Sequence, residues 1–299
     1  MIRPVRRLGV IGVGLIGGSF ARALREQGLV REVVGCGRSR PNLAEAKRLG
    51  VVDRFTLDPA EAVQGADLVF LATPVRAMPK IIQAIRRSLA PGTIITDAGS
   101  TKSALLKALE PRLPASVQFV PGHPIAGREK SGVRASSAGL FQEQWVILTP
   151  TRKTSAAALN RVRRLWEACG ARVERMPPAE HDRVFGAVSH LPHLVAYALV
   201  DTIMRWKSPR PLLGYSAGGF KDFTRIAASS PEMWRDICLE NRQAILQAMD
   251  RYGKVFVRLR RMVESGDECG LEKLFDEARE VTQQLSQAQE LRAARKGRR

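Results

Sequence analysis

The stretch LGVIGVGLIGGSFARAL, residues 8–24, constrains the fold more than any other part of the chain. It sets Gly12, Gly14 and Gly17 between a strand-like apolar run and a helix-like run. In that context the first glycine makes a tight turn, the second lets the backbone approach a pyrophosphate, and the third lets helix pack on strand. The phosphates would lie at the helix N-terminus, where free N–H groups favour negative charge. A structural glycine-rich turn is the alternative, but we predict a dinucleotide site that includes Gly12, Gly14, Leu15, Ile16 and Gly17.

Strand-like and helix-like runs alternate through the first part of the chain. This alternation is typical of parallel strands with helical crossovers, and it predicts an α/β, doubly wound, Rossmann-type dinucleotide-binding domain. The expected strands are Leu8–Val13, Glu32–Cys36, Ala66–Thr73, Thr93–Asp97, Val117–Val120, Trp145–Thr149 and Ala171–Arg175. The expected helices are Ile16–Gln27, Asn42–Leu49, Pro79–Leu89, Ser103–Leu109 and Ala156–Cys169.

Two consecutive prolines, Pro177 and Pro178, indicate a domain boundary, because they favour extended backbone and lack N–H donors. Beyond them, apolar residues recur at helical spacing in His181–Trp206, Glu232–Glu264 and Leu271–Lys296. We therefore predict a dinucleotide-binding domain over residues 1–177 and an all-α domain over residues 178–299. Long apolar-faced helices in so small a domain need a partner surface, which favours a homodimer formed through this half.

A net charge of +19 is the strongest compositional signal, and it is compatible with a nucleic-acid partner or with an anionic small molecule. Aromatic residues make up only 6% of the chain, and no basic cluster is interleaved with them to form a base-stacking surface. We therefore expect a small-molecule anion as partner and no nucleic acid. The basic C-terminal tail, with Arg292, Arg295, Lys296, Arg298 and Arg299, has the character of a solvated helix end.

Cysteine usage and hydropathy bear on location. The four cysteines show neither disulfide-framework nor zinc-ligand spacing, which fits a reducing compartment. No apolar run approaches the roughly 20 residues that span a bilayer, and the basic N-terminus leads directly into a strand-like run. We expect a cytoplasmic protein without a membrane partner.

The end of the second predicted strand bears on the type of dinucleotide. An NAD site usually has an acidic residue there for the ribose hydroxyls, but this chain has Gly37 followed by Arg38, Ser39 and Arg40. Two guanidinium groups and a hydroxyl suit a 2′-phosphate, so the sequence favours NADP over NAD, although a surface arginine pair often has no such role. Thr73 and Pro74, at the end of the next strand, are expected to line the cofactor path.

Two loops with chemically distinctive residues follow successive strands: DAGSTKSAL at Asp97–Leu105 and PGHPIAGREKSG at Pro121–Gly132. At these motifs the chain resembles a known family, the prephenate and arogenate dehydrogenases of tyrosine biosynthesis. The motifs occur in the expected order over nearly the whole chain. They are GxGLIGGS at Gly12–Ser19, GSTK at Gly99–Lys102, HPIAGREKSG at His123–Gly132, SHLPH at Ser189–His193, and GGFKDFTRIA at Gly218–Ala227 followed by Met233-Trp234.

The resemblance implies an NAD(P)-dependent oxidoreductase with a nucleotide-binding domain, a helical dimerisation domain and a dicarboxylate substrate. In such enzymes hydride leaves C4 of a cyclohexadienol, the ring carboxylate leaves as CO₂, and a base accepts the 4-hydroxyl proton. The family's catalytic base corresponds to His123, and histidine suits this role because its ordinary pKa is about 6.5. Its active-site serine corresponds to Ser100, which is also placed to cap a helix over Thr101–Leu109.

The resemblance also implies the substrate-binding residues. Arg225 corresponds to the carboxylate receptor, for which a guanidinium is well suited. Glu129 would help to close the site, unless it is a surface charge, and Trp234 would lie near the substrate unless it only packs in the bundle. The remaining substrate-binding candidates are His193 and Gly218.

For the other histidines, His181 and His190, the sequence predicts structural roles and no metal site. His190 and His193 share a helix face, but no carboxylate or cysteine completes a ligand set, so no metal is expected. We expect His190 to pack or form hydrogen bonds within the bundle and His181 to be exposed.

Two other functions remain open at this point: another small-acid dehydrogenase of the same two-domain plan, and a non-enzymatic basic protein that binds nucleotide or nucleic acid. A missing catalytic lysine in a helical GxxxK setting disfavours the first. The sequence does not distinguish prephenate from arogenate.

Overall fold

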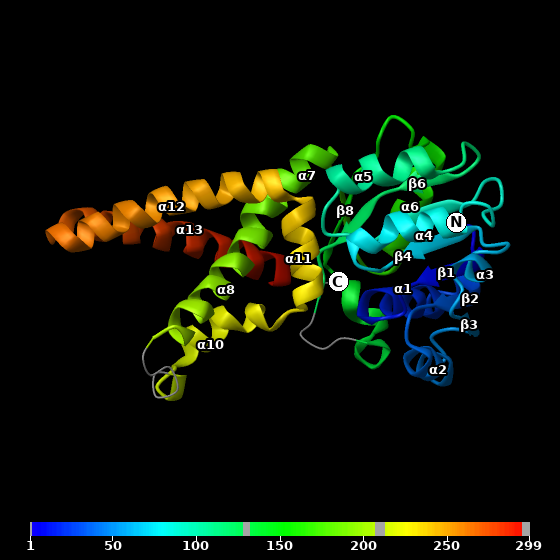
Figure 1. Ribbon diagram of the computed structural model, residues 1–299, viewed down its shortest axis with the longest axis horizontal. Coiled ribbons are helices and arrows are strands. Elements are labelled where there is room, and N and C mark those ends of the chain that lie inside the picture. Colours follow the sequence, from blue (N-terminus) through cyan, green and yellow to red (C-terminus); the bar gives the residue numbers. More distant parts are fainter. Residues whose placement is uncertain (1, 128–131, 207–212, 295–299) are drawn as a thin grey trace. The chain divides into compact units, whose positions relative to one another are not determined.

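The computed structural model describes residues 2–127, 132–206 and 213–294, and it divides into two compact units, Met1–Ile245 and Leu246–Arg299 (Figure 1). In the first unit, six parallel strands form the main sheet, in the order β3-β2-β1-β4-β5-β6. The order reverses direction between β1 and β4, which is the switch point where doubly wound sheets bind ligands. The predicted α/β nucleotide-binding fold is confirmed.

The strands and helices of this region follow the predicted alternation, with ends that differ by a few residues. Two short elements, β3 and α3, were not predicted. The elements up to the sixth strand are β1 (Val5–Ile11), α1 (Leu15–Glu26), β2 (Val30–Cys36), α2 (Arg40–Arg48), β3 (Arg54–Thr56), α3 (Pro59–Ala62), β4 (Leu68–Leu71), η1 (Val75–Ala77), α4 (Met78–Ile85), β5 (Ile94–Asp97), α5 (Ser103–Leu109), η2 (Glu110–Arg112) and β6 (Gln118–Val120).

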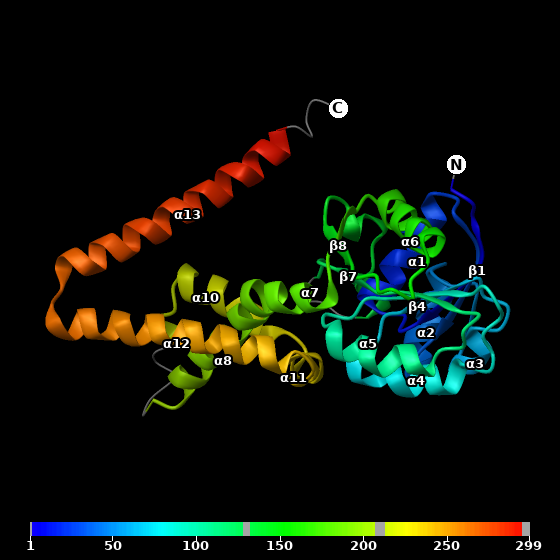
Figure 2. The same ribbon diagram turned by 90° about the horizontal axis from the view of Figure 1, so that it is seen from above.

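Each face of the main sheet is covered by its own apolar core, because successive side chains of a strand point to opposite faces. In β4, Leu68 and Phe70 belong to one core, and Val69 and Leu71 belong to the other. Figure 2 shows α1 and α6 (Ala156–Ala168) on one face, and α4 and α5 on the other. The sheet is therefore buried on both sides, which leaves the carboxyl ends of its strands as the place for a site.

A second, three-stranded sheet was not predicted as a separate structure. It consists of β7 (Gly122–Pro124), β8 (Trp145–Leu148) and β9 (Arg172–Arg175), with β7 antiparallel to β8 and β8 parallel to β9. Strand β7 pairs only with β8, and an edge strand tolerates a residue without an N–H donor. His123 therefore lies within a sheet, whereas its flanking prolines had indicated a loop. Two short helical turns, η3 (Val133–Ala135) and η4 (Ala138–Phe141), precede β8.

The regular elements that the structure describes from Pro178 onward are all helical. In the first unit they form α7 (Pro178–Phe185), a π turn η5 (Gly186–His190), α8 (Leu191–Met204), α10 (Gly218–Thr224), η6 (Arg225–Ala228) and α11 (Pro231–Glu240). The segment predicted as one helix over Glu232–Glu264 is divided at Asn241, whose side-chain amide donates to the Asp182 carbonyl and to Nδ1 of His190. A small apolar core of Trp234, Ile237 and Ile245 packs against Leu194 and Tyr197 of α8.

One helical run, Pro178–Met204, is long and apolar enough to cross a membrane by length and composition alone. Helices that pack inside soluble proteins pass the same test. This run carries His181, Asp182 and His190, which are buried and hydrogen-bonded to other elements of the first unit. These bonds identify its first half as a helix that packs against protein.

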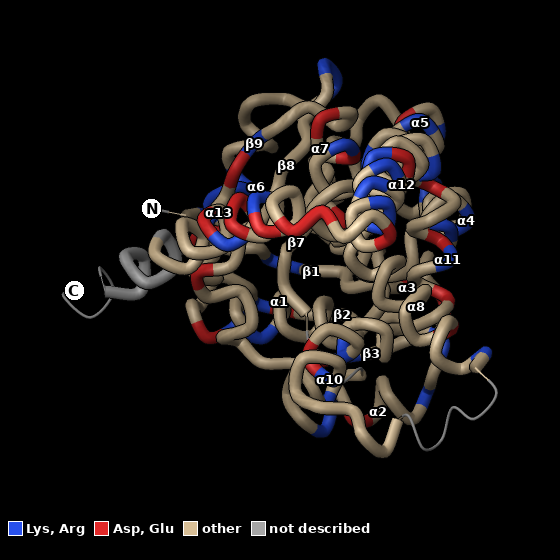
Figure 3. Tube along the Cα trace, turned by 90° about the vertical axis from the view of Figure 1, so that its left-hand side faces the viewer, with Lys and Arg blue, Asp and Glu red and all other residues tan. Residues whose placement is uncertain are grey.

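The second unit comprises most of α12 (Arg242–Ser265) and α13 (Glu268–Ala294), joined by a turn in which Gly266 has φ +66°. Exposed apolar side chains on these helices include Val255, Phe256, Phe275 and Leu285. Figure 3 shows Lys and Arg on α12 and also on α4 and α5. The positive charge is thus spread over elements that are distant in sequence.

Candidate active site

The turn after β1 has the geometry that the glycine motif predicts. Gly12 has φ +100°, and a Cβ there would lie 2.3 Å from the Ala72 carbonyl oxygen. A Cβ on Gly17 would lie 2.2 Å from the Gly12 oxygen, whereas Gly14, the N-cap of α1, has nothing within 4 Å of such a position. Gly14 therefore borders open space at the start of a helix whose first residues are Leu15 and Ile16. These features fit a dinucleotide, with room for a pyrophosphate at the helix N-terminus.

The end of β4 also fits a ligand. Thr73 and Pro74 form the connection from β4 to η1, on the edge where Gly12 turns. The Thr73 hydroxyl is buried and has no hydrogen-bond partner among the described residues. Since buried polar atoms in native proteins are normally bonded, this hydroxyl is a donor and acceptor for a bound group.

The three residues proposed to select NADP have different surroundings. The Ser39 hydroxyl caps α2 by accepting from the backbone N–H of Asn42. The Arg38 guanidinium lies 3.5 Å from the carboxylate of Glu232 on α11. The Arg40 guanidinium stands over the Phe55 ring, 6.0 Å from its centroid. Within this structure, therefore, each of the three already has a protein partner.

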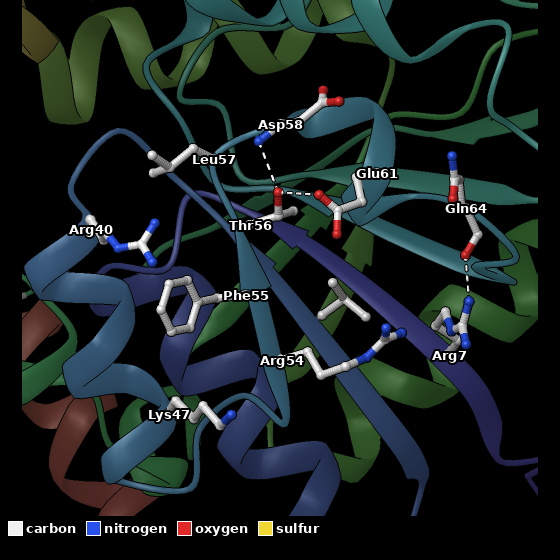
Figure 4. A pocket seen from close by; sticks show the side chains of 11 residues that line it. Arg7, Arg40, Lys47, Arg54, Phe55, Thr56, Leu57, Asp58, Glu61 and Gln64 are labelled. Carbon is white, nitrogen blue, oxygen red and sulfur yellow. Dashed lines mark hydrogen bonds between the residues drawn. The ribbon is translucent and has the colours of Figure 1, made fainter.

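Figure 4 shows a pocket of ≈ 790 Å³ beside β3, in which Arg40 and Phe55 lie at one end and Arg7 and Gln64 at the other. Two hydrogen bonds join lining residues: the Thr56 hydroxyl donates to Glu61, and Arg7 donates to the Gln64 carbonyl. The pocket is lined mainly by α2, β3 and α3, with Arg7 of β1 and Val34 of β2, and does not include the residues around His123. We therefore place the chemistry elsewhere.

His123, the predicted base, is buried in β7 and faces α7 of the helical region. Its Nδ1 lies 2.8 Å from Nε2 of His181, and Nδ1 of His181 lies 2.9 Å from Oδ1 of Asp182. The Phe185 ring packs edge-on against His123, with centroids 5.0 Å apart. Three polar side chains from two elements thus form one buried chain, and Phe185 shields it.

A buried ion pair between Lys102 and Asp97 lies next to the strand that carries His123. Nζ of Lys102 donates to Oδ2 of Asp97 and to the Gly122 carbonyl, both at 2.6 Å. The backbone N–H of Lys102 donates to Oδ1 of Asp182 at 2.8 Å, and that of Ser103 donates to Oδ2 at 2.8 Å. The start of α5 therefore holds β7 through Gly122 and holds α7 through Asp182.

The buried environment changes the basicity of these groups. Burial lowers the pKa of His123 well below its ordinary value, and the nearby charges of His181 and Lys102 act in the same direction. Burial also lowers the pKa of His181, against the opposing effect of its hydrogen bond to Asp182. Burial raises the pKa of Asp182, but the bonds from His181 and Ser103 lower it further, with a net decrease. At neutral pH both histidines are therefore neutral and Asp182 is ionised.

A second group of aromatic side chains lies between α8 and α11. The His193 ring stacks on Trp234 with centroids 3.9 Å apart, and its Nδ1 donates to the Ser189 carbonyl. His190 is buried, accepts from Asn241 at Nδ1, and has a pKa lowered by burial to about 4. Nε2 of His190 and the indole nitrogen of Trp234 are buried without partners in the described chain. This group can therefore still bind a polar ligand.

The remaining predicted residues are not joined to His123 by the contacts just described. Ser100 is half-buried between β5 and α5, and its hydroxyl bonds to none of the residues that the structure describes. Arg225 begins η6, which packs against α8, the helix that carries His193. Gly218 begins α10 and has open space around it. Glu129 lies outside the described residues.

Two structural interpretations from the sequence are wrong. Ser100 does not cap α5, because that helix begins at Ser103 and its N-cap position is Lys102. His181 is not exposed: its exposed fraction is 0%, because the face of α7 that carries it packs on β7 and the start of α5. His190 does form the expected hydrogen bond within the helical region.

Four residues that the structure brings to this site had not been singled out: Asp97, Lys102, His181 as a partner, and Asp182. Asp97 and Lys102 stand within the DAGSTK motif, and the adjacent His181-Asp182 pair begins the first helix after the two prolines. An acidic residue at the end of a buried strand and a lysine just before the next helix are the signal that could have identified the ion pair. Among the described residues, no cluster of His, Cys, Asp or Glu could hold a metal ion.

The chain is similar over nearly its full length to proteins of one family. The nucleotide-binding domain of prephenate dehydrogenase matches residues 20–175, and the dimerization domain of prephenate dehydrogenase matches residues 177–277. Cyclohexadienyl dehydrogenase of Zymomonas mobilis is 38% identical over 289 residues, which cover 96% of this chain and 98% of that protein. Prephenate dehydrogenase of Bacillus subtilis is 38% identical over 271 residues, 90% of this chain and 73% of that protein.

Solved structures agree. Prephenate dehydrogenase from Aquifex aeolicus, in complex with hydroxyphenyl propionate and NAD+, superposes with a TM-score of 0.86 at 41% identity, and covers 92% of this chain and 96% of that one. The arogenate dehydrogenase of Synechocystis has a TM-score of 0.75 at 27% identity, over 91% of this chain and 96% of that one. Both cover the α/β and the helical regions.

Proposed function

The chain belongs to the prephenate dehydrogenase family, and on that premise we propose that it catalyses the oxidative decarboxylation of prephenate or arogenate in tyrosine biosynthesis. The observation that supports this most is the buried His123, neutral at pH 7, in a chain that also has a nucleotide cradle with open space at Gly14. A neutral, shielded imidazole suits general-base chemistry on a hydroxyl group.

In the proposed reaction His123 accepts the proton of the 4-hydroxyl group as hydride leaves C4. Gly12, Gly14, Leu15, Ile16 and Gly17 would hold the pyrophosphate of the dinucleotide, whose nicotinamide would supply the hydride acceptor. Loss of CO₂ returns the electron pair of the broken C–C bond to the ring, and the oxygen becomes a phenol oxygen. Phe185, packed against His123, keeps water away from the imidazole.

Substrate binding is assigned to residues from both regions of the first unit. We propose Arg225 as the carboxylate receptor, and His193 and Trp234 as side chains that face the substrate. The buried, unpartnered indole nitrogen of Trp234 supports this assignment, since a polar ligand would satisfy it. Ser100, whose hydroxyl lies after β5, is proposed to orient the substrate hydroxyl, with Gly218 at the margin of the site. The predicted role of Glu129 in closing the site remains a prediction.

For the cofactor, we propose a preference for NADP that depends mainly on Arg38. The hydroxyl of Ser39 is used as a helix cap, and Arg40 stacks on Phe55, so Arg38 is the side chain best placed to change partner. A 2′-phosphate would compete with Glu232 for the Arg38 guanidinium. Thr73 and Pro74 would line the path of the nicotinamide half.

The function is tested by measuring the absorbance of reduced nicotinamide with each of two substrates, prephenate and arogenate, and each of two cofactors, NAD and NADP, at equal concentrations. We expect turnover with at least one substrate, and a higher kcat/KM with NADP than with NAD. A strong preference for NAD would contradict the cofactor proposal alone. Failure of all four combinations, together with tight and steeply salt-dependent binding to arbitrary DNA, would favour a nucleic-acid-binding protein instead.

Replacing Arg225 with alanine is expected to raise the KM for the dicarboxylate by at least about 10-fold, because a charge-assisted bond to a carboxylate contributes about 1.5–3 kcal/mol. The KM for the cofactor should change little. Steady-state kinetics of Arg225→Ala, Arg225→Lys and wild type provide the measurement. Arg225→Lys keeps the charge but loses the bidentate geometry, so its KM should lie between the other two. An unchanged KM in Arg225→Ala would remove Arg225 from the substrate site.

We further propose a cytoplasmic homodimer that assembles through the helical region, with a domain boundary near residue 177. The exposed apolar residues Val255, Phe256, Phe275 and Leu285 of the second unit supply a surface that needs covering. The matched dimerization domain extends to residue 277 and includes α12. Sedimentation at several protein concentrations would measure the assembly.

A further inference from the structure

We propose that His181 and Asp182 act through His123: they fix which of its nitrogens is the base, and they hold the abstracted proton until it returns to the product. His181 and Asp182 are positioning residues, since His181 contacts His123, Asp182 contacts His181, and neither is assigned to the substrate. The inference rests on the proposed function, because it concerns what happens to the proton that His123 accepts.

The direction of each hydrogen bond follows from Asp182. Its two oxygens accept from the backbone N–H groups of Lys102 and Ser103, and an ionised carboxylate has no proton to donate. Nδ1 of His181 must therefore donate to Asp182, which leaves a lone pair on Nε2 of the neutral ring. That lone pair accepts from Nδ1–H of His123, 2.8 Å away. The lone pair of His123 is consequently on Nε2, the nitrogen outside this chain of bonds.

Proton transfer along this chain is balanced at every atom. The O–H bond of the substrate breaks, and a new N–H bond forms at Nε2 of His123. The Nδ1–H proton of His123 can then move to Nε2 of His181, which gives an imidazolium whose Nδ1–H remains bonded to the Asp182 carboxylate. Phe185 packs against both rings, but only His181 bonds to an anion, so the positive charge passes to the ring whose charged form is favoured.

The groups around His181 support the same assignment. Besides Asp182, the charged side chains that act on it are Lys102 at the start of α5, which disfavours its protonation, and Asp97 at the end of β5, which favours it. Lys102 is itself paired with Asp97 at 2.6 Å. On the side of η5, His190 acts on His123, and its own pKa of about 4 keeps it neutral at pH 7. Asp182 is therefore the anion in direct contact with His181.

The overall reaction has no need for a proton exit. Decarboxylation places an electron pair on the ring and its oxygen, so the proton that leaves the 4-hydroxyl group can return to the same oxygen as the phenol forms. His123, His181 and Asp182 are at most 7% exposed, and the backbone bonds to Asp182 close the far end of the chain. A buried hydrogen-bond chain without a path to solvent suits a reaction in which the abstracted proton returns to the product.

Nitrogen NMR of the histidines tests the tautomers without any turnover. The chain has only four histidines, and ¹⁵N shifts distinguish a protonated from a lone-pair nitrogen. At pH 7 we expect the proton on Nδ1 in His123 and His181, and also in His193, which donates to the Ser189 carbonyl. We expect it on Nε2 in His190, which accepts at Nδ1 and so serves as an internal reference for the opposite tautomer. A proton on Nε2 of His123 would overturn the proposal.

Three variants separate orientation from proton storage. His181→Gln keeps an oxygen that can accept from Nδ1–H of His123 but cannot take up a proton, and His181→Phe keeps the ring without either nitrogen. Asp182→Asn replaces one carboxylate oxygen with an NH₂ group. This group would face a backbone N–H or Nδ1–H of His181, and it cannot accept from either donor. We expect kcat to fall by about 10²-fold in His181→Phe and Asp182→Asn, at the low end of the range for a general base, and by an intermediate factor in His181→Gln.

The pH profile is the measurement that a purely structural role would not change. If His181 and Asp182 share the proton, His181→Gln makes His123 a weaker base, and the acid limb of kcat/KM against pH moves to lower pH. An acid limb that stays in place, or that moves to higher pH because a repulsive neighbour was removed, would overturn the proposal. Absence of turnover in the wild type, with the NMR tautomers as expected, would contradict the proposed function and not the bond directions.

Discussion

Replacing His123 with asparagine is expected to lower kcat by roughly 10²–10⁴-fold, the usual contribution of a positioned general base. Asparagine removes the Nε2 lone pair but keeps an amide near the position of Nδ1, which can still donate to Nε2 of His181. The loss should therefore reflect the base and not a collapse of the buried chain. Steady-state turnover gives kcat, and fluorescence titration gives the affinity for the cofactor, which should be almost unchanged because the nucleotide cradle lies after β1.

A second substitution tests whether the loss of activity is due to the missing base. His123→Gln places an amide near the position of Nε2 and also provides no base, so it should be as inactive as His123→Asn. Full activity in both variants would mean that another group accepts the proton. Equal losses of cofactor affinity and kcat would indicate that the variants are misfolded.

Replacing Lys102 with methionine is expected to destabilise the folded protein by about 3–5 kcal/mol, because it leaves a buried carboxylate without its cation. Lys102 and Asp97 both have exposed fractions of 0%. Asp97 would still accept from the backbone N–H groups of Gly99 and Gly122, but the Gly122 carbonyl would lose the bond from Nζ. The midpoint of urea unfolding, followed by tryptophan fluorescence, measures the effect.

Lys107→Met is the matched control, because Lys107 lies on α5, the helix that Lys102 precedes as N-cap, and is exposed. It should change stability by no more than about 0.5 kcal/mol. The double variant Lys102→Met, Asp97→Asn should lose less than the sum of its single changes, since residues in one ion pair are energetically coupled. A small effect of Lys102→Met would show that the pair contributes little and that β7 is held by its pairing with β8.

The main sheet could be predicted because its strands are buried on both faces and appear as apolar runs. β3 was missed because Arg54–Thr56 is a short strand at the edge of the sheet, and its residues are only partly buried. β7 was missed because Pro121 and Pro124 flank His123, and a proline in a run of residues argues against its being a strand. What the sequence did not reveal is that β7 is an edge strand, where a missing N–H donor costs little.

The site could be predicted in its motifs but not in its contacts. His123 was found because a histidine after a strand matched a motif, and Lys102 stood in another motif with no role assigned. His181 was expected to be exposed because helical periodicity shows which residues share a face, but not which element covers that face. The hydrogen bond between His123 and His181 links residues 58 positions apart, one on strand β7 of the small sheet and the other on helix α7. Such pairings depend on tertiary structure.

The π turn Gly186–His190 separates two parts of one helical run whose side chains contact different elements. Residues before it carry His181 toward β7, and residues after it carry His193 toward Trp234 on α11. In a regular helix each residue advances the direction of the side chain by about 100°, so the wider turn changes the angular phase between the two histidines. Removing one residue from this turn would rotate the whole of α8 relative to α7. The helix would remain, but His181 and His193 could no longer contact both His123 and Trp234 at the same time.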